Sequence, residues 1–188
     1  MKLYLFAGPN GSGKSTIIAN YIREYQLNDV EYVCPDIYAA ELFSDIDDIY
    51  ERYAKAMSFA EHKREKLLKN RKPFIMETVL SRVDKLDFIK QAKALGYRII
   101  SVYVSTESAD INIERVKKRV SEGGHDVPED KLRARYERSL KNLPVLSALS
   151  DELYVYDNTV TPKLVAAVID GERYSADIVP SWVVLNIQ

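Results

Sequence analysis

One short segment limits what this chain can fold into more than any other. Residues 8–15 read GPNGSGKS and match the pattern G-x-x-x-x-G-K-[ST] in full. A short apolar run from Lys2 to Ala7 precedes the segment and indicates a buried strand, while Ser15 to Tyr25 has the composition of a helix. A strand before the glycines and a helix after them form the context in which this pattern makes a phosphate-binding loop.

Each part of this segment suits the binding of a nucleotide. Glycines let the backbone curve around a phosphate with its N–H groups inward, and the N-terminus of the following helix adds a favourable dipole. We expect Lys14 to reach the β- and γ-phosphates, Ser15 to ligate Mg²⁺ and Thr16 to support it. The predicted cofactors are ATP and Mg²⁺, and the predicted nucleotide-binding residues are Gly8, Pro9, Asn10, Gly11, Ser12, Gly13, Lys14, Ser15 and Thr16.

The rest of the chain alternates short apolar runs with helical segments. This alternation predicts an α/β protein with the P-loop NTPase fold, in which a parallel sheet has helices on both faces. We expect residues 1–188 to form one domain. The predicted strands after the first are Glu31–Cys34, Phe74–Met76, Tyr97–Val104 and Leu153–Tyr156, and the predicted helices are Ile46–Asn70, Val83–Leu95, Ala109–Val120 and a last one that ends near Leu149.

Two further expectations concern the chain's end and its long helix. Leu164–Ile169 and Trp182–Leu185 are predicted to form a hairpin or edge strands around Asp170-Gly171. The apolar positions of the long helix lie roughly on one face, which we expect to be buried: Ile49, Tyr53, Met57, Ala60 and Leu67.

Composition narrows the classes of function. The net charge of −1 over 188 residues disfavours a nucleic-acid partner, because such binders usually carry a basic excess. Cys34 is the sole cysteine, which excludes an intrachain disulfide and a zinc site built on paired cysteines. The N-terminal apolar run is too short for a signal peptide or a membrane span. We therefore expect a cytoplasmic protein without a membrane segment.

Two acidic residues follow predicted strands. Parallel sheets bind ligands at the carboxyl ends of their strands, where Asp36 follows the second strand and Glu77 the third. Asp36 is our candidate for the base that receives the proton of a hydroxyl acceptor; the alternative is an N-cap for a helix from Ile37 to Phe43. Glu77 would contact the substrate or lie near Mg²⁺ through water, and its alternative is a solvent-exposed strand end.

A glycine-rich break interrupts an arginine-rich helical run. Residues 121–128 read SEGGHDVP, which indicates a hinge or tight turn within a helical lid around residues 115–138. Arg115, Arg119 and Arg135 flank the break and could face the triphosphate, because arginine binds phosphate bidentately. Arg119 ranks first because it is nearest the break; the alternative for each arginine is a solvated helix face. His125 either contacts substrate or occupies the turn.

Together these segments resemble the zeta toxin family of P-loop kinases. The resemblance runs from Leu3 to about Asn158 and rests on GPNGSGKST, the Asp after the second strand, FIMETVLS, RVKKRVSEGGHDVPEDKLRARYERSLKNL and YDN. It implies transfer of a phosphate from ATP, with Mg²⁺, to the 3′-hydroxyl of UDP-N-acetylglucosamine. By the same resemblance Lys14 would hold phosphates, Asp36 would be the base, Glu77 and Thr78 would face the acceptor, and arginines of the lid would stabilise the transition state.

Two departures from the family pattern bear on the acceptor. The family's toxins carry a helical segment before the loop, which here begins at Gly8, and they have Glu-Gly-Thr followed by Arg where residues 77–82 read ETVLSR. The chain therefore resembles a short, stand-alone branch of the family, and the identity of its small-molecule acceptor is left open. An antitoxin partner is open and is not strongly implied.

Three readings of function remain. The first is a kinase acting on a hydroxyl of a small metabolite. The second is a nucleotide-dependent switch or binding module that hydrolyses ATP slowly and acts through a partner. The third, an RNA-end kinase, is disfavoured by the near-neutral charge. Asp157-Asn158 would lie near the adenine in the first reading, although this pair is also ordinary in turns.

Overall fold

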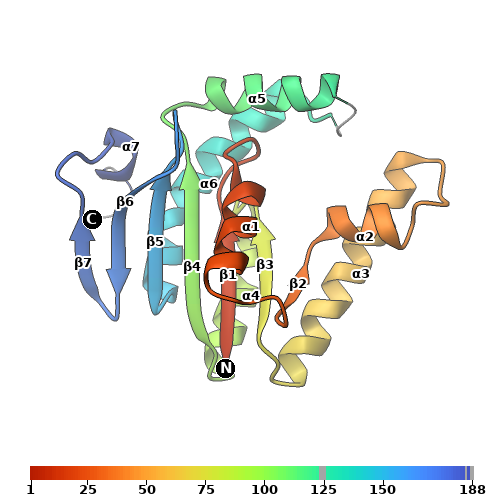
Figure 1. Cartoon of the computed structure of the whole chain (residues 1–188), viewed down its shortest axis with the longest axis horizontal. Coiled ribbons are helices and arrows are strands. Elements are labelled where there is room, and N and C mark those ends of the chain that lie inside the picture. The colour runs from red at the N-terminus through yellow and green to blue at the C-terminus, as the bar shows by residue number, and fades with distance from the viewer. Residues whose placement is uncertain (123–125, 185, 187–188) are drawn as a thin grey trace.

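Seven strands form one sheet in the order β2-β3-β1-β4-β5-β6-β7 (Figure 1). The computed structural model describes residues 1–122, 126–184 and 186. The first five strands in this order are parallel, and β6 and β7 add an antiparallel hairpin. The strands are β1 (Lys2–Ala7), β2 (Glu31–Val33), β3 (Phe74–Thr78), β4 (Arg98–Ser105), β5 (Glu152–Asp157), β6 (Lys163–Ile169) and β7 (Glu172–Ser175).

The centre of the sheet explains why its strands read as continuous apolar runs. β1 lies between β3 and β4, and its residues after Lys2 are all buried. Ala7 at its end is in register with Thr78 of β3 and Tyr103 of β4. The carboxyl ends of these strands therefore meet at one edge of the sheet, which we call the carboxyl edge.

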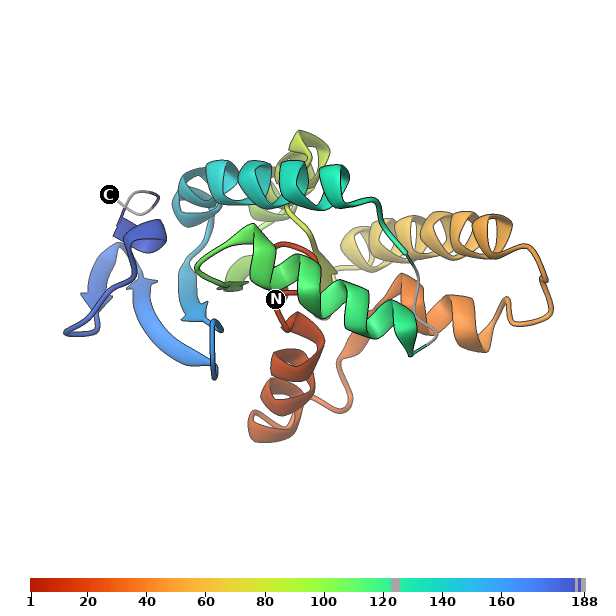
Figure 2. The ribbon, with the colours of Figure 1, turned by 90° about the horizontal axis from the view of Figure 1, so that it is seen from above.

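Helices cover both faces of the sheet, so the predicted α/β fold is confirmed. α1 covers one face, where Ile17 and Ile18 pack against β1 and β4 side chains, while α3, α4 and α6 cover the other (Figure 2). Within the described residues, no helix combines the length and apolar character needed to cross a bilayer. The helices are α1 (Lys14–Glu24), α2 (Pro35–Glu41), α3 (Ile49–Lys69), α4 (Val83–Ala94), α5 (Ala109–Ser121), α6 (Glu129–Leu149) and α7 (Ser181–Val184).

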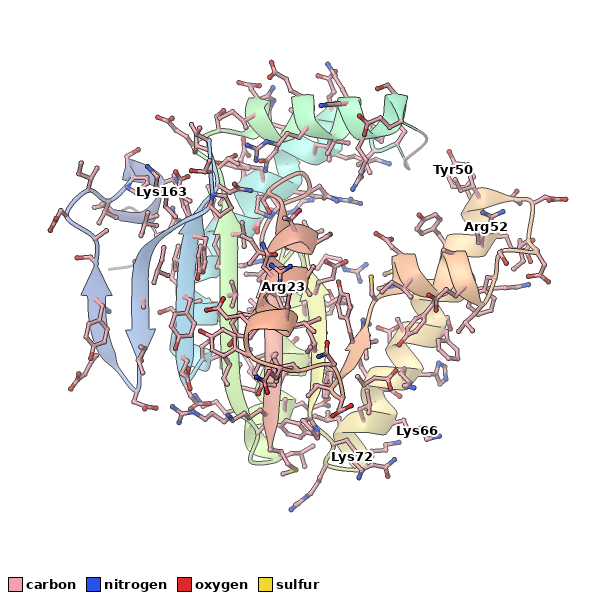
Figure 3. The ribbon with its side chains drawn as sticks, in the orientation of Figure 1. Arg23, Tyr50, Arg52, Lys66, Lys72 and Lys163 are labelled. Atoms are coloured by element: carbon pink, nitrogen blue, oxygen red, sulfur yellow. The ribbon has the colours of Figure 1, made fainter. Side chains whose placement is uncertain are left out.

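Two helices frame the carboxyl edge. α5 lies across this edge, and Ile113 and Val116 pack it against Leu132 of α6 (Figures 1 and 2). α3 lies to the side of the sheet beyond β2, with Tyr50 and Arg52 at the level of the carboxyl edge and Lys66 at the level of the opposite edge (Figure 3). The predicted break between α5 and α6 includes residues 123–125, which lie outside the described residues.

The prediction of a strand at Trp182–Leu185 is wrong. Ser181–Val184 form the short helix α7, in which Trp182 and Val183 are buried and the Trp182 Nε1–H donates to Asp157 Oδ1 at 3.3 Å. The second strand of the hairpin is Glu172–Ser175, joined to β6 by Asp170-Gly171 with φ of 49° and 88°. The predicted turn is thus correct and its partner strand lies nearer in sequence.

The buried face of α3 agrees with the prediction only in part. Ala60 is buried, and Tyr53 and Leu67 are partly buried against the core. The prediction is wrong for Ile49 and Met57, which are exposed at 42% and 48%. The helix instead buries Ala56, Arg64 and Leu68 beside Ala60. These four positions are spaced four apart, so the buried stripe lies next to the predicted one and shares Ala60 with it.

Candidate active site

The phosphate loop joins β1 to α1 at the carboxyl edge. Its glycines Gly8, Gly11 and Gly13 have φ of 141°, 77° and 91°. At Gly11 a Cβ atom would overlap the main-chain carbonyl oxygen of Asn112, so the loop meets α5 backbone to backbone. Only glycine combines this φ with such a close approach. The loop therefore has the glycine-dependent curvature that phosphate binding needs.

Lys14 lies at the first position of α1, with its ammonium turned back onto the loop. Its Nζ donates to Gly8 O at 2.8 Å and to Pro9 O at 2.9 Å. Burial lowers the pKa of Lys14 below its ordinary value; the Glu77 and Asp36 carboxylates oppose this shift and the Arg119 guanidinium adds to it. The pKa of this ammonium group is thus sensitive to charges carried by β3, α2 and α5.

The two predicted acids lie on adjacent parallel strands. Val33 is in register with Met76, which brings Cys34 beside Glu77, and the Cys34 thiol donates to Glu77 Oε1 at 3.6 Å. Glu77 is half-buried, and burial followed by the charge of this carboxylate raises the pKa of the Cys34 thiol. Because its neighbours are a thiol and an ammonium rather than bulk water alone, Glu77 is not the solvent-exposed strand end of the alternative.

Asp36 lies in the first turn of α2 and is exposed. The N-cap of α2 is Cys34, with Pro35 at the first helical position, and no side chain caps the helix. The alternative that Asp36 is the N-cap is therefore wrong. Its carboxylate is left available for solvent or substrate at the N-terminus of a helix, where negative charge is favoured.

The turn after β3 is held in an unusual conformation. Thr78 Oγ1 accepts the Leu80 N–H at 3.0 Å, and Thr78 O accepts the Gly8 N–H at 3.2 Å. Leu80 is fully buried with a φ of 57°, a region that costs non-glycine residues about 1–3 kcal/mol. Asn142 of α6 holds it by donating Nδ2–H to Leu80 O at 2.8 Å. Thr78, a predicted acceptor contact, is therefore held by its side chain to Leu80 and by its main chain to Gly8.

The predicted arginines separate into different environments. The Arg115 guanidinium donates to Thr159 O at 3.0 Å, so it binds the segment after β5. Arg119 is exposed one turn further along α5, and its charge reaches Lys14. Arg135 is half-buried on α6, with no hydrogen bond or ion pair found in the described part of the chain. His125 lies outside the described residues.

The loop's hydroxyl residues bear on the predicted metal. Ser15 and Thr16 are exposed in the first turn of α1. Among residues 1–122, 126–184 and 186, no three His, Cys, Asp or Glu side chains gather as a metal site. Mg²⁺ keeps several waters and takes phosphate oxygens as ligands, so a single hydroxyl such as that of Ser15 fits its role beside a bound nucleotide.

With this geometry in place, comparison with known proteins identifies the family. A family model described as Zeta toxin matches residues 2–165. The chain belongs to the Zeta toxin family. An uncharacterized protein of Haemophilus influenzae is 30% identical over 142 residues, which make up 72% of this chain and 92% of that protein.

Solved structures share the fold of this Zeta toxin family member. A chain of the AvrRxo1-ORF1:-ORF2 complex crystallised with ATP has a TM-score of 0.72 and 17% identity, covering 94% of this chain and 60% of that one. This chain therefore spans 60% of the length of that relative. A structure of the PezAT chromosomal toxin-antitoxin system of Streptococcus pneumoniae has a TM-score of 0.66 and 19% identity, covering 86% and 69%. At such identities the fold alone follows.

The sequence did not reveal several residues around this Zeta toxin loop. Asn158 donates its Nδ2–H to Ser12 O at 2.8 Å, a contact with the phosphate loop that the sequence did not indicate. Tyr53 is half-buried at the start of α3, and burial and the Asp36 carboxylate raise its pKa. Cys34 touches Glu77 although it was noted only as a lone thiol. Asn158 follows a strand end, which was the one sequence signal available for it.

Proposed function

We propose that this Zeta toxin family protein is an ATP-dependent kinase that transfers the γ-phosphate to a hydroxyl group of a small acceptor. One observation carries the proposal: Asp36 and Glu77 lie at or just after the ends of adjacent parallel strands at the carboxyl edge, where Thr78 O accepts the N–H of Gly8 in the phosphate loop. Phosphoryl transfer needs cations on the phosphates and a carboxylate near the acceptor hydroxyl. Lys14 of the loop supplies a cation, and the two carboxylates lie at the same edge of the sheet as the loop.

The contacts support the following roles. Main-chain N–H groups of the loop and of the first turn of α1 would hold the phosphates, and Lys14 would exchange its carbonyl partners Gly8 and Pro9 for phosphate oxygens. The Ser15 hydroxyl would be one ligand of Mg²⁺, which would supply positive charge beside the phosphates. Asp36 would take the proton of the acceptor hydroxyl while the acceptor oxygen bonds to the γ-phosphorus. The bond from the γ-phosphorus to the oxygen that bridges it to the β-phosphorus would break at the same time and release ADP. Arg119 stabilises the charge in transit.

The acceptor lies on the side of Glu77. The Glu77 carboxylate would orient the acceptor hydroxyl, and the turn after β3 would line the acceptor site beyond Glu77. A nucleotide sugar such as UDP-N-acetylglucosamine is the first acceptor to test, because the chain belongs to the Zeta toxin family. The C-terminal half of α5 and the N-terminal half of α6 would act as a lid that excludes water during transfer.

The test is ATP turnover with Mg²⁺ over a panel of hydroxyl acceptors, for wild type, Asp36→Asn and Asp130→Asn. Asp130 is a matched control, since it is an exposed aspartate in the first turn of α6. We expect one acceptor to be phosphorylated, Asp36→Asn to lose this transfer with ATP affinity retained, and Asp130→Asn to behave as wild type. Slow ATP hydrolysis that no acceptor stimulates and that Asp36→Asn leaves unchanged would refute the proposal and favour a switch.

A further inference from the structure

Asn158 connects the end of β5 to the phosphate loop. Its side-chain Nδ2–H donates to Ser12 O at 2.8 Å, and its own main-chain N–H donates to Ser105 O at 2.7 Å. The residue is 9% exposed. Both its backbone and its amide are therefore fixed, one to β4 and one to the loop.

The hydrogen bond to Ser12 O determines which way the next N–H points. The Ser12–Gly13 peptide is trans, and in a planar trans peptide the C=O and N–H bonds point in opposite directions. Since the carbonyl points at Asn158, the Gly13 N–H points away from it. No main-chain acceptor of this N–H is found within the described residues. The Gly13 N–H is thus a donor with a fixed direction and no main-chain acceptor in the part of the chain that the structure describes.

The same side chain also limits the residue at position 13. Gly13 is the N-cap of α1 with a φ of 91°, and a Cβ atom there would overlap Asn158 Nδ2. The amide thus packs directly under the N-terminus of α1, where backbone donors and the helix dipole favour an anion.

Residues on either side keep Asn158 in place. Thr159 Oγ1 accepts the Glu107 N–H at 2.9 Å and donates to Asp157 Oδ1 at 2.7 Å. Thr159 O accepts from Arg115 of α5 at 3.0 Å. The amide of Asn158 is consequently presented by a braced turn, so its contact with the loop does not depend on a mobile side chain.

We propose that Asn158 is a positioning residue of the phosphate loop, which orients the Ser12–Gly13 peptide so that the Gly13 N–H donates to a nucleotide phosphate. The inference rests on the proposed binding of ATP and adds a residue outside the loop motif to it. It gives Asn158 a role at the phosphates through one Nδ2–H, whereas the expected contact with the adenine stays a prediction.

The experiment measures the affinities of Asn158→Leu and wild type for two ligands, ATP and inorganic tripolyphosphate, by calorimetry. Leucine has nearly the same shape and adds no charge beside the phosphates, but it cannot donate to Ser12 O. We expect both ligands to bind about tenfold more weakly or worse, because a buried donor is lost and the carbonyl is left unpaired. Asn186→Leu is the matched control: Asn186 also donates Nδ2–H to a main-chain carbonyl, that of Trp182, at 2.7 Å. It should retain wild-type affinity for both ligands.

Each outcome decides a different point. Equal affinities of wild type and Asn158→Leu would overturn the inference and leave the proposed function intact. Weaker binding of ATP with unchanged binding of tripolyphosphate would also overturn it, because Asn158 would then act on the adenosine part. If wild type binds neither ligand, the proposed function and this inference both fail. Should Asn158→Leu not fold, Asn158→Ser, whose hydroxyl is too short to reach Ser12 O, replaces it, and the increase in Tm on adding each ligand reports binding.

Discussion

Replacing Arg119 by alanine should slow phosphoryl transfer and leave the stability of the fold nearly unchanged. The side chain is exposed on α5, and no hydrogen bond or ion pair holds it within the described residues. A surface change of this kind alters the free energy of unfolding by less than about 0.5 kcal/mol. Its charge nonetheless adds to the lowering of the Lys14 pKa by burial, which supports a role for the guanidinium at the phosphate loop. An arginine that stabilises the transferring phosphoryl group contributes about 10³-fold or more to kcat, or ~4 kcal/mol.

The assay is single-turnover transfer to the acceptor found by the panel, together with thermal unfolding of each variant. Arg23→Ala is the control, because Arg23 is also exposed and lies in the last turn of α1, where it donates to Asn20 Oδ1 at 2.9 Å. It should keep the wild-type kcat. If Arg119→Ala transferred phosphate as fast as Arg23→Ala, the proposed role of Arg119 at the transition state would be wrong, and α5 would carry only a solvated basic face.

Two further predictions concern stability. Arg71 follows α3 with a φ of 53°, whereas Gly96 occupies the equivalent position after α4 with a φ of 81°. Arg71→Gly should therefore raise the free energy of unfolding by about 1 kcal/mol, and Gly96→Ala should lower it by about as much. Urea unfolding measures both changes, and no gain in stability for Arg71→Gly would contradict the argument. Burial and the charge of Glu31 raise the pKa of Tyr38 to about 12, and burial and Glu152 do the same for Tyr154, from an ordinary 10.0. The two hydroxyls lose their protons at a lower pH in the unfolded chain than in the folded one. Their contribution to the free energy of unfolding is therefore complete below pH 10.0 and is lost as the pH rises through about 12. Unfolding measured together with tyrosinate absorbance over this pH interval tests the prediction, which is wrong if stability does not fall.

The sequence predicted well the features that residues close together in the chain determine. The loop, its strand and its helix are specified by neighbouring residues, and a parallel sheet follows from the alternation of strands and helices. Asp36 and Glu77 could be placed at one edge for the same reason, and the register of Val33 with Met76 brings their segments together. A short apolar run such as that around Trp182 suits a strand or a helix equally, so its state depends on the core against which it packs.

What the sequence could not give is contact between distant segments. Asn158 lies 146 residues from Ser12, and their hydrogen bond exists because β5 pairs with β4 and ends beside the loop. The contact of Arg115 is a second example. Helical spacing places Arg115 on one face with Arg119, but its guanidinium donates to Thr159 O in a distant segment. Spacing along a helix predicts a shared face and leaves open which acceptor lies nearest.

The contacts divide the proposed site into two sides with different supports. The phosphate side is built by β1, β5 and α5, through Asn158 and the close approach of α5 to Gly11. The acceptor side is built by β2, β3 and α6, through the thiol at Glu77 and the amide of Asn142 that holds the turn after β3. A main-chain hydrogen bond from Gly8 N to Thr78 O joins the two. Since a main-chain bond does not depend on side-chain identity, substitutions in the turn after β3 can change which acceptor is used while ATP is still held in the same way.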